Sequence, residues 1–361
     1  MSKTSRKSQS SFANIITPDT INAFKDYVVV WFANAALTYF SYINIYRGLA
    51  DPRLIRGSYE QICNEAQVEG DRDELKDLIS KSLQEAVNEL CEIAQGIRTP
   101  SIERLEWYFA PEFGEFVKLL IPFEVKDRES ESRRKVYGVS TDIVNLAVIG
   151  AYKTYVYKVR VTSGIEYGFV YLDVPEPPLL DFKKLEDSAT GIVRVIYYGN
   201  GSKIALYTSV ASVLALTAGS KLELLQPFTL HLIRLVKEKG KGKKVRIVGF
   251  DYIDVTILAR VIHRLGISGA LYTLLRLYPT EKTQKSVEGC KQFRRFLEEL
   301  SKSLMMYSEL NDVEYLYHIL RSIIHNGKIN SDIEKCLSGM GVKEGWSDLR
   351  NKLFNIRIRF T

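Results

Sequence analysis

The sequence has few of the residues that build metal sites and redox centres. Four cysteines and four histidines occur in 361 residues. The cysteines form no C-x-x-C pair and have no histidine at metal-ligand spacing; they are Cys63, Cys91, Cys290 and Cys336. The sequence therefore predicts neither a zinc site nor a redox pair, and this use of cysteine favours a reducing, cytoplasmic setting.

Motifs for nucleotide binding and hydrolysis are also missing. Residues 240 to 244 are rich in glycine and lysine, but they lack the spacing and the hydroxyl residue of a phosphate-binding P-loop. There is no G-x-S-x-G elbow and no His-Asp doublet of the kind that metal-dependent phosphohydrolases use. A packed or surface role is favoured for each histidine, namely His231, His263, His318 and His325. We therefore expect no cofactor and no enzymatic activity.

No apolar run reaches the ~20 residues that a membrane span needs. The segment Tyr27 to Phe40 is strongly apolar but shorter, which predicts a buried core helix. Residues 1 to 12 are polar and basic without an apolar stretch, which predicts a disordered basic tail and not a signal peptide.

Positive charge is what the sequence has in excess, with a formal net charge of +7. Such a balance favours an acidic partner, of which nucleic acid is the commonest and an anionic membrane is the rival. Few methionines and histidines beside many Lys, Glu, Tyr and Ile residues are compatible with a thermophilic source.

The densest positive charge lies between residues 237 and 246, where six basic residues face Glu238 alone, a net of +5. The six are Lys237, Lys239, Lys241, Lys243, Lys244 and Arg246. A loop loosened by glycine can contact phosphates without reading sequence. A solvated turn between a helix and a strand explains the same pattern equally well.

Residues 155 to 161 and 165 to 171 alternate at period two on either side of Thr162, Ser163 and Gly164, which predicts an antiparallel hairpin. Beside this hairpin the sequence offers a second basic patch with aromatic residues that could stack on unpaired bases. Its basic residues are Lys153, Lys158 and Arg160, and the tyrosines nearby are Tyr152, Tyr155 and Tyr157. The alternative is a core hairpin whose charges are solvated.

Residues 192 to 198 and 202 to 208 predict a further hairpin, joined by a Gly-Asn-Gly turn. At its tip Asn200 and Lys203 could reach a groove edge of a nucleic acid. An asparagine at a turn tip is also favoured simply because it tolerates positive φ.

The best enzymatic alternative uses Asp251 and Asp254, which follow a predicted strand at residues 245 to 250. Two carboxylates there could hold magnesium for phosphodiester cleavage. Their spacing also matches a helix start capped by Asp251, and this interpretation is favoured because a third ligand is missing nearby.

The overall pattern predicts an α+β protein: a mixed N-terminal region with antiparallel hairpins, followed by a C-terminal α-helical bundle. We expect an α+β nucleic-acid-binding domain at residues 13–278, with a proline-rich connector near 173–178, and a helical domain at 279–361. Further expected helices are 71–95, ended by Gly96, and 228–236, 282–306, 312–325, 331–338 and 346–355. A strand is expected at 117–125 and an exposed charged loop at 126–135, while 142–152 fits a helix or a buried strand.

The order of these segments resembles a known family. A mixed α/β region containing NLAVIGAYKTYVYKVR (residues 145–160), a hairpin, the connector LDVPEPP (172–178) and a helical bundle follow one another. In this order and in overall length the chain resembles the large subunit of crenarchaeal subtype I-A CRISPR interference complexes. The resemblance covers most of the chain and contains no short diagnostic motif.

This resemblance implies a non-catalytic subunit of an archaeal antiviral ribonucleoprotein. Such a subunit binds CRISPR RNA and target DNA, helps to recognise the protospacer-adjacent motif and docks the helicase-nuclease, beside backbone and small subunits. No individual residue is carried over from the family, and the basic residues named above are inferred from this sequence alone. The alternatives are the magnesium-dependent nuclease and a structural interaction subunit with the segment Tyr27 to Phe40 partly exposed.

Overall fold

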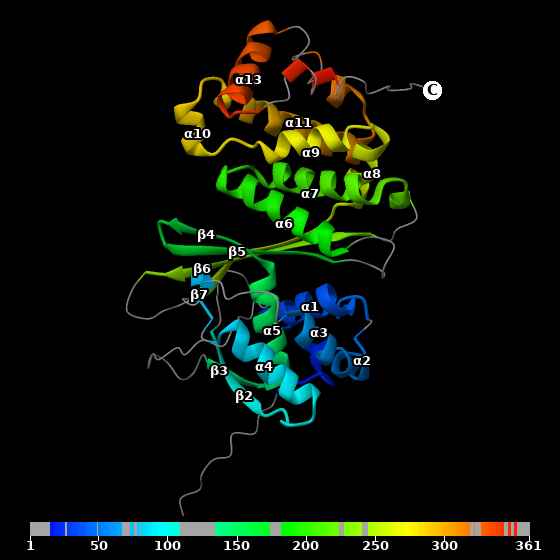
Figure 1. Ribbon diagram of the computed structural model, residues 1–361, viewed down its shortest axis with the longest axis vertical. Helices are drawn as coiled ribbons and strands as arrows, with labels where there is room; N and C mark the ends of the chain where they lie inside the picture. The colour runs from blue at the N-terminus through cyan, green and yellow to red at the C-terminus, as the bar shows by residue number, and fades with distance from the viewer. Residues whose placement is uncertain are drawn as a thin grey trace, which may run out of the picture. The chain divides into compact units, whose positions relative to one another are not determined.

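The computed structural model describes residues 15–25, 27–48, 50–66, 73–75, 78–79, 81–108, 134–173, 182–223, 227–239, 245–317, 321, 326–342, 346–347 and 350–351. Helices and two sheets are present and the C-terminal part is helical, which confirms the α+β class (Figure 1). The predicted basic tail and residues 174–178 of the connector lie outside the described residues.

The chain forms two compact units that do not follow the predicted domain boundaries. Unit 1 consists of Met1–Glu166 and Arg234–Val248, and unit 2 of Tyr167–Ile233 and Gly249–Thr361. The predicted boundary between residues 278 and 279 therefore falls inside unit 2.

Two apolar helices form the core of unit 1. Helix α1 (Val28–Ser41) packs against α5 (Thr141–Thr154), as Figure 1 shows. They approach so closely that a β-carbon at Gly150 would lie 1.9 Å from the carbonyl oxygen of Phe32. Because α1 is buried from Val28 to Phe40, the predicted core helix is confirmed and its partial exposure as a docking segment is wrong. Residues 142 to 152, for which the pattern left two possibilities, are helical.

Unit 1 also contains a three-stranded sheet and shorter helices. Strand β3 (Arg134–Ser140) lies between β1 (Ile15–Ile16), which is parallel to it, and β2 (Ile102–Tyr108), which is antiparallel. The helices are η1 (Ile21–Phe24), α2 (Pro52–Gly57), α3 (Tyr59–Ala66), η2 (Asp73–Leu75) and α4 (Leu83–Ala94).

The helix predicted for residues 71–95 begins later than expected. A capping box between Ser82 and Glu85 starts α4, because the Ser82 side chain accepts from the backbone N–H of Glu85 and the Glu85 carboxylate accepts from that of Ser82. The predicted end at Gly96 is correct, with a φ of 71°. The predicted strand 117–125 and residues 126–133 of the charged loop lie outside the described residues, while Arg134 and Lys135 begin β3.

A second sheet has the strand order β4-β5-β6-β7. Its strands are β4 (Tyr155–Val161), β5 (Gly164–Asp173), β6 (Thr229–Glu238) and β7 (Val245–Asp254). The predicted β4–β5 hairpin and the strand beginning at Val245 are confirmed. The helix predicted for residues 228–236 is wrong, because this apolar run is too short for periodicity to distinguish the two structures and pairing with β5 and β7 makes it a strand.

The hairpin predicted for residues 192–208 is also wrong, since both halves are helical. Helix α6 (Phe182–Tyr198) is followed by α7 (Lys203–Ala218), and the two helices pack together (Figure 1). The β-branched residues Ile192, Val193 and Ile196 are buried at helical spacing. Packing therefore outweighs the β propensity of this run.

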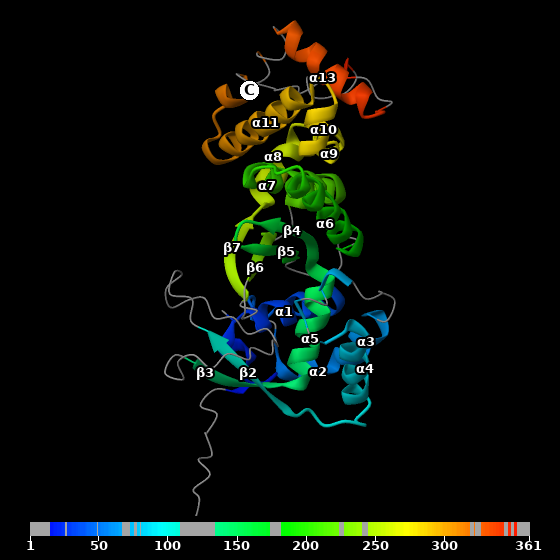
Figure 2. The same ribbon diagram turned by 90° about the vertical axis from the view of Figure 1, so that its left-hand side faces the viewer.

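Helix α7 packs against several other helices of unit 2. It packs against α6, α8 (Thr256–Arg264), α9 (Ser268–Arg276) and α11 (Cys290–Leu310), which Figure 2 shows from the side. Helices α10 (Glu281–Ser286) and α13 (Gly327–Gly339) also belong to unit 2. The predicted continuous helix 282–306 is interrupted after α10, where Gly289 has a φ of 83°.

Of the described helices, one passes the length and composition test for a membrane span. It is Lys203–Glu223, and 67% of its most apolar window is buried inside the protein, as in the core helix of a globular domain.

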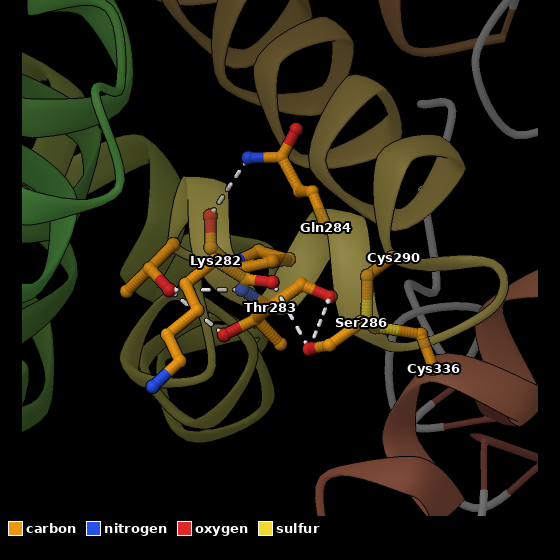
Figure 3. Close-up of a disulfide and its surroundings, with 8 residues drawn as sticks. Lys282, Thr283, Gln284, Ser286, Cys290 and Cys336 are labelled. Carbon is orange, nitrogen blue, oxygen red and sulfur yellow. Dashed lines mark hydrogen bonds between the residues drawn. A yellow bond between two sulfur atoms is a disulfide. The ribbon is translucent and has the colours of Figure 1, made fainter.

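All four cysteines are paired in disulfides, which the sequence did not predict. Cys63 in α3 bonds to Cys91 in α4, and Cys290 in α11 bonds to Cys336 in α13 (Figure 3). The partners are 28 and 46 residues apart in the sequence, so no local motif indicates the pairing. Disulfides do not fit the expected reducing setting, except in intracellular proteins of hyperthermophiles, where they are common.

Candidate nucleic-acid interface

The end of β6 is fastened to the β4–β5 turn within unit 1. The backbone N–H of Lys239 donates to the carbonyl oxygen of Ser163 at 3.2 Å, and its ammonium donates to that of Thr162 at 3.5 Å. The first residue of β5, Gly164, allows this approach, because a β-carbon there would lie 2.0 Å from the carbonyl oxygen of Lys237. The basic loop after β6 therefore starts directly beside the hairpin turn.

Basic side chains from two strands lie at this end of the sheet. Arg160 near the end of β4 is exposed, and the half-buried Lys158 donates from its ammonium to the carbonyl oxygen of Glu74 at 3.4 Å. At the end of β6, Lys237 is half-buried and Lys239 is exposed. We call the set Lys158, Arg160, Lys237 and Lys239 the hairpin-end surface.

Nearby acidic groups offset this charge only in part. Glu166 is buried, accepts a hydrogen bond from the Tyr157 hydroxyl at 3.0 Å and lies 4.0 Å from the Arg234 guanidinium. Its charge is thus balanced inside the protein, whereas Glu238 remains half-buried beside the lysines. The hairpin-end surface keeps a net positive charge.

Several predicted contacts fall on residues whose side chains are not described. Lys241, Lys243 and Lys244 lie outside the described residues, and of Arg246 only the backbone position in β7 is described.

Much of the predicted hairpin patch faces the protein interior. Its tyrosines Tyr152, Tyr155 and Tyr157 are at most 5% exposed, so the prediction that they stack on bases is wrong. Both faces of β4 are buried at its start, which the alternating pattern of the sequence did not indicate. The Lys153 ammonium lies 3.9 Å from the ring centroid of Tyr39, a cation–π contact with the core helix α1.

Asn200 belongs to the turn between two helices of unit 2 and not to a hairpin tip. Its φ is 56°, which confirms that the turn needs a residue tolerant of positive φ. Its carbonyl oxygen accepts from the Arg294 guanidinium at 2.5 Å, and its side-chain amide donates to the Glu281 carboxylate at 3.3 Å. These contacts give Asn200 a structural role.

A polar network from α11 holds the same turn. The Glu298 carboxylate accepts from the backbone N–H of Ser202 at 2.9 Å and from the hydroxyls of Ser202 and Tyr278. Burial, together with the hydrogen bond to Glu298, raises the pKa of Tyr278 above its ordinary value. Gly199 is required here, since a β-carbon would lie 2.4 Å from the Tyr278 ring.

Asp251 and Asp254 do not form a joint carboxylate site. Both lie in β7, where residues three apart point to opposite faces of the strand. Asp251 pairs with the Lys203 ammonium at 2.8 Å, and the Asp254 carboxylate accepts from the backbone N–H of Thr256 at 2.8 Å. The predicted capping by Asp251 is wrong because the strand continues to Asp254, which makes the contact at the helix start instead.

Within the described residues there is no cluster of three or more His, Cys, Asp or Glu side chains that could hold a metal ion. Lys203, paired with Asp251, lies in unit 2, as does Asn200. The residues of the hairpin-end surface belong to unit 1.

The aromatic side chains of Phe250 and Tyr252 in β7 are exposed, which was not predicted from the sequence. The sequence contained one indication of them: Phe250 and Tyr252 extend the alternating pattern of the strand predicted at residues 245–250.

No family model, no curated protein and no solved structure matches this chain. The geometry of its own residues is therefore the basis for assigning a function.

Proposed function

We propose that this chain is a non-catalytic nucleic-acid-binding subunit whose hairpin-end surface contacts the phosphate backbone. The observation that carries the proposal is the contact of Lys239 with the β4–β5 turn. It brings basic residues from β4 and β6, which are about 80 residues apart in the chain, to one end of a sheet within one compact unit.

The residue types suit phosphate contacts. Arg160 presents a planar guanidinium that can bind a phosphate through two parallel hydrogen bonds, whereas the lysines act as point charges. Such contacts set affinity and register but do not read bases. The hairpin-end surface therefore fits a protein that follows a nucleic-acid backbone.

The finer proposal, based on the family resemblance, is the large subunit of a subtype I-A CRISPR interference complex. It would work in the cytoplasm of a thermophilic archaeon with CRISPR RNA, target DNA, backbone and small subunits, and the helicase-nuclease. In such complexes base pairing reads most of the target, and protein subunits contact backbone and a short adjacent motif. A surface that binds phosphates without base readout suits this division of labour.

The test is binding of the full chain to labelled duplex DNA, single-stranded DNA and CRISPR-type RNA at several salt concentrations. Each phosphate contact contributes about 0.9 to the slope of log affinity against log salt on duplex DNA. A variant with Lys158, Arg160, Lys237 and Lys239 changed to Ala is expected to bind more weakly and with a flatter slope.

The matched control removes four exposed lysines of unit 2, which are Lys282, Lys285, Lys291 and Lys302. It has the same net charge as the first variant, so a general charge effect would weaken both equally. Equal salt slopes in the two variants, or no binding by the wild-type chain at moderate salt, would contradict the proposal. The finer assignment is tested by co-purification with tagged backbone and small subunits and CRISPR RNA.

A further inference from the structure

The sequence contains two asparagine–glycine pairs, Asn200–Gly201 and Asn326–Gly327. At such a pair the backbone nitrogen of the glycine can attack the side-chain Cγ of the asparagine, because glycine has no β-carbon to obstruct the approach. The attack needs a glycine N–H that is not held in a hydrogen bond, and an asparagine side chain that lies near that nitrogen. The structure places the two pairs in different surroundings.

The first pair, Asn200–Gly201, is held by hydrogen bonds in the turn between α6 and α7. The backbone N–H of Gly201 donates to the carbonyl oxygen of Ile196 at 2.8 Å, and the Asn200 amide donates to the Glu281 carboxylate at 3.3 Å. A β-carbon at Gly201 would lie 2.5 Å from the Ile196 side chain, so the turn is closely packed. Attack by the Gly201 nitrogen therefore requires that these contacts open first.

The second pair, Asn326–Gly327, lies at the start of α13. Asn326 is the N-cap of this 13-residue helix, Gly327 is its first residue, and both are exposed. The N–H of the first residue of an α-helix has no acceptor within the helix. No described atom lies within 4 Å of a β-carbon placed on Gly327. The nitrogen that would attack is therefore not held by the helix, and there is space beside it.

The helix cap also assists this reaction. The Asn326 Oδ1 accepts a hydrogen bond from the backbone N–H of Ile329 at 3.2 Å, which keeps the side chain over the first turn. Attack on Cγ places negative charge on Oδ1. An N–H at the positive end of a helix stabilises a charge that develops at such a position.

We propose that Asn326 is a deamidation site of the folded protein and that the fold protects Asn200 from the same reaction. The Gly327 nitrogen loses its proton and bonds to Asn326 Cγ. The bond from Cγ to the side-chain nitrogen breaks, and this nitrogen leaves with the proton as ammonia, which gives a cyclic imide. Water then opens the imide at one of its two carbonyl carbons. Because water is the only co-reactant, the modification is independent of the proposed function.

The two products affect α13 differently. Aspartate at position 326 remains a good N-cap and adds a negative charge at the positive end of the helix. Isoaspartate carries the chain through its side-chain carbon, which adds one methylene to the backbone and removes the cap on Ile329. Helix α13 stays attached in both cases, because Cys336 is bonded to Cys290.

The test incubates the full-length wild-type chain at mildly alkaline pH, once folded and once unfolded in urea. Peptide mapping by mass spectrometry, with fragmentation that identifies isoaspartate, measures the rate of conversion at both asparagines. The ratio of the folded rate to the unfolded rate is expected to be at least about tenfold larger at Asn326 than at Asn200, since Asn200 reacts only after local opening. A ratio at Asn326 that is no larger than at Asn200, or no conversion of Asn326 in the folded chain, would overturn the proposal.

The matched control is Gly327→Ala, for which α13 has space. Its β-carbon obstructs the attacking nitrogen, so Asn326 is expected to convert roughly tenfold or more slowly than in wild type, with no change at Asn200. Far-ultraviolet circular dichroism checks that the variant is folded. Equal conversion of Asn326 in the variant and in wild type would mean that the backbone nitrogen of residue 327 is not the attacking group, and the proposal would fail.

Discussion

The backbone N–H of Lys239 donates a hydrogen bond to the carbonyl oxygen of Ser163 across 3.2 Å, which joins the end of β6 to the β4–β5 turn. This contact depends on Gly164, because any β-carbon there would overlap the Lys237 carbonyl group. The geometry of the hairpin-end surface therefore depends on one glycine.

Gly164→Ala is expected to destabilise the protein by about 1–3 kcal/mol, as overpacking does when backbone must move. The displaced strand end would also carry Lys239 away from the turn and weaken nucleic-acid binding. Urea unfolding and anisotropy titrations measure the two effects.

The control is Gly191→Ala in α6, where no described atom lies within 4 Å of the added β-carbon. Alanine in a helix interior is expected to stabilise by about 0.5–1 kcal/mol. A Gly164→Ala protein as stable as Gly191→Ala would show that the close approach at Lys237 is absent.

Removing the Cys290–Cys336 disulfide is expected to reduce stability, because the bond closes 46 residues of chain between α11 and α13. Loop-closure entropy sets the loss for Cys290→Ser/Cys336→Ser at about 4 kcal/mol or less. Urea unfolding with and without reductant measures it. In a variant lacking all four cysteines, reductant should change nothing, and a wild-type chain insensitive to reductant would argue against the bonds.

Glu89 links α4 to basic residues of unit 1 and predicts a pH dependence. Its carboxylate lies 2.6 Å from the Lys81 ammonium and 3.2 Å from the Arg98 guanidinium, and it accepts from the Asn145 amide at 3.3 Å. Desolvation opposes ionisation, but the hydrogen bond and the charge of Lys81, with help from Asn145 and Arg98, outweigh it and lower the pKa of Glu89 below 4.5.

A carboxyl group whose pKa is lower in the folded than in the unfolded protein stabilises the fold at pH values above its unfolded-state pKa. This stabilisation is lost as the pH falls through the folded-state pKa. Glu89→Gln is therefore expected to be less stable than wild type at neutral pH, with the difference shrinking on acidification below pH 4.5. Urea unfolding across this pH range tests it. A difference that grows on acidification would contradict the assignment.

Asn200 is expected to contribute to stability and not to binding. Asn200→Gly keeps the positive φ of the turn and should leave nucleic-acid affinity unchanged, whereas Asn200→Val is expected to cost about 1–3 kcal/mol of stability. Thermal unfolding and anisotropy separate the two effects. A loss of affinity in the folded glycine variant would return Asn200 to the binding site.

Local pattern was enough where a segment had one feasible structure. The run Tyr27 to Phe40 is apolar all round and too long for a strand, so it had to be a buried helix. The alternation on both sides of Thr162 and Ser163 had to be a hairpin. The basic character of residues 237–239 and 158–160 followed from composition, and the structure brought those two segments to one end of a sheet.

Local pattern failed where a short apolar run fits both periods. Residues 192–198 have strand-like composition but are helical, and Ile192, Val193 and Ile196 form a buried face of α6. Residues 228–236 were predicted to be helical, but the chain from Thr229 onward forms strand β6. The distant partners that decide these segments are not visible in a window of ten residues.

Charge, fold class, the core helix α1 and the β4–β5 hairpin were determined by the sequence itself, because each depends on residues that are neighbours in the chain. The disulfide partners, the ion pair of Lys203 with Asp251 and the stacking of Tyr252 on His231 were decided only by the tertiary structure. These contacts join residues about 20 to 50 positions apart, whose meeting depends on how helices and strands pack and not on local periodicity.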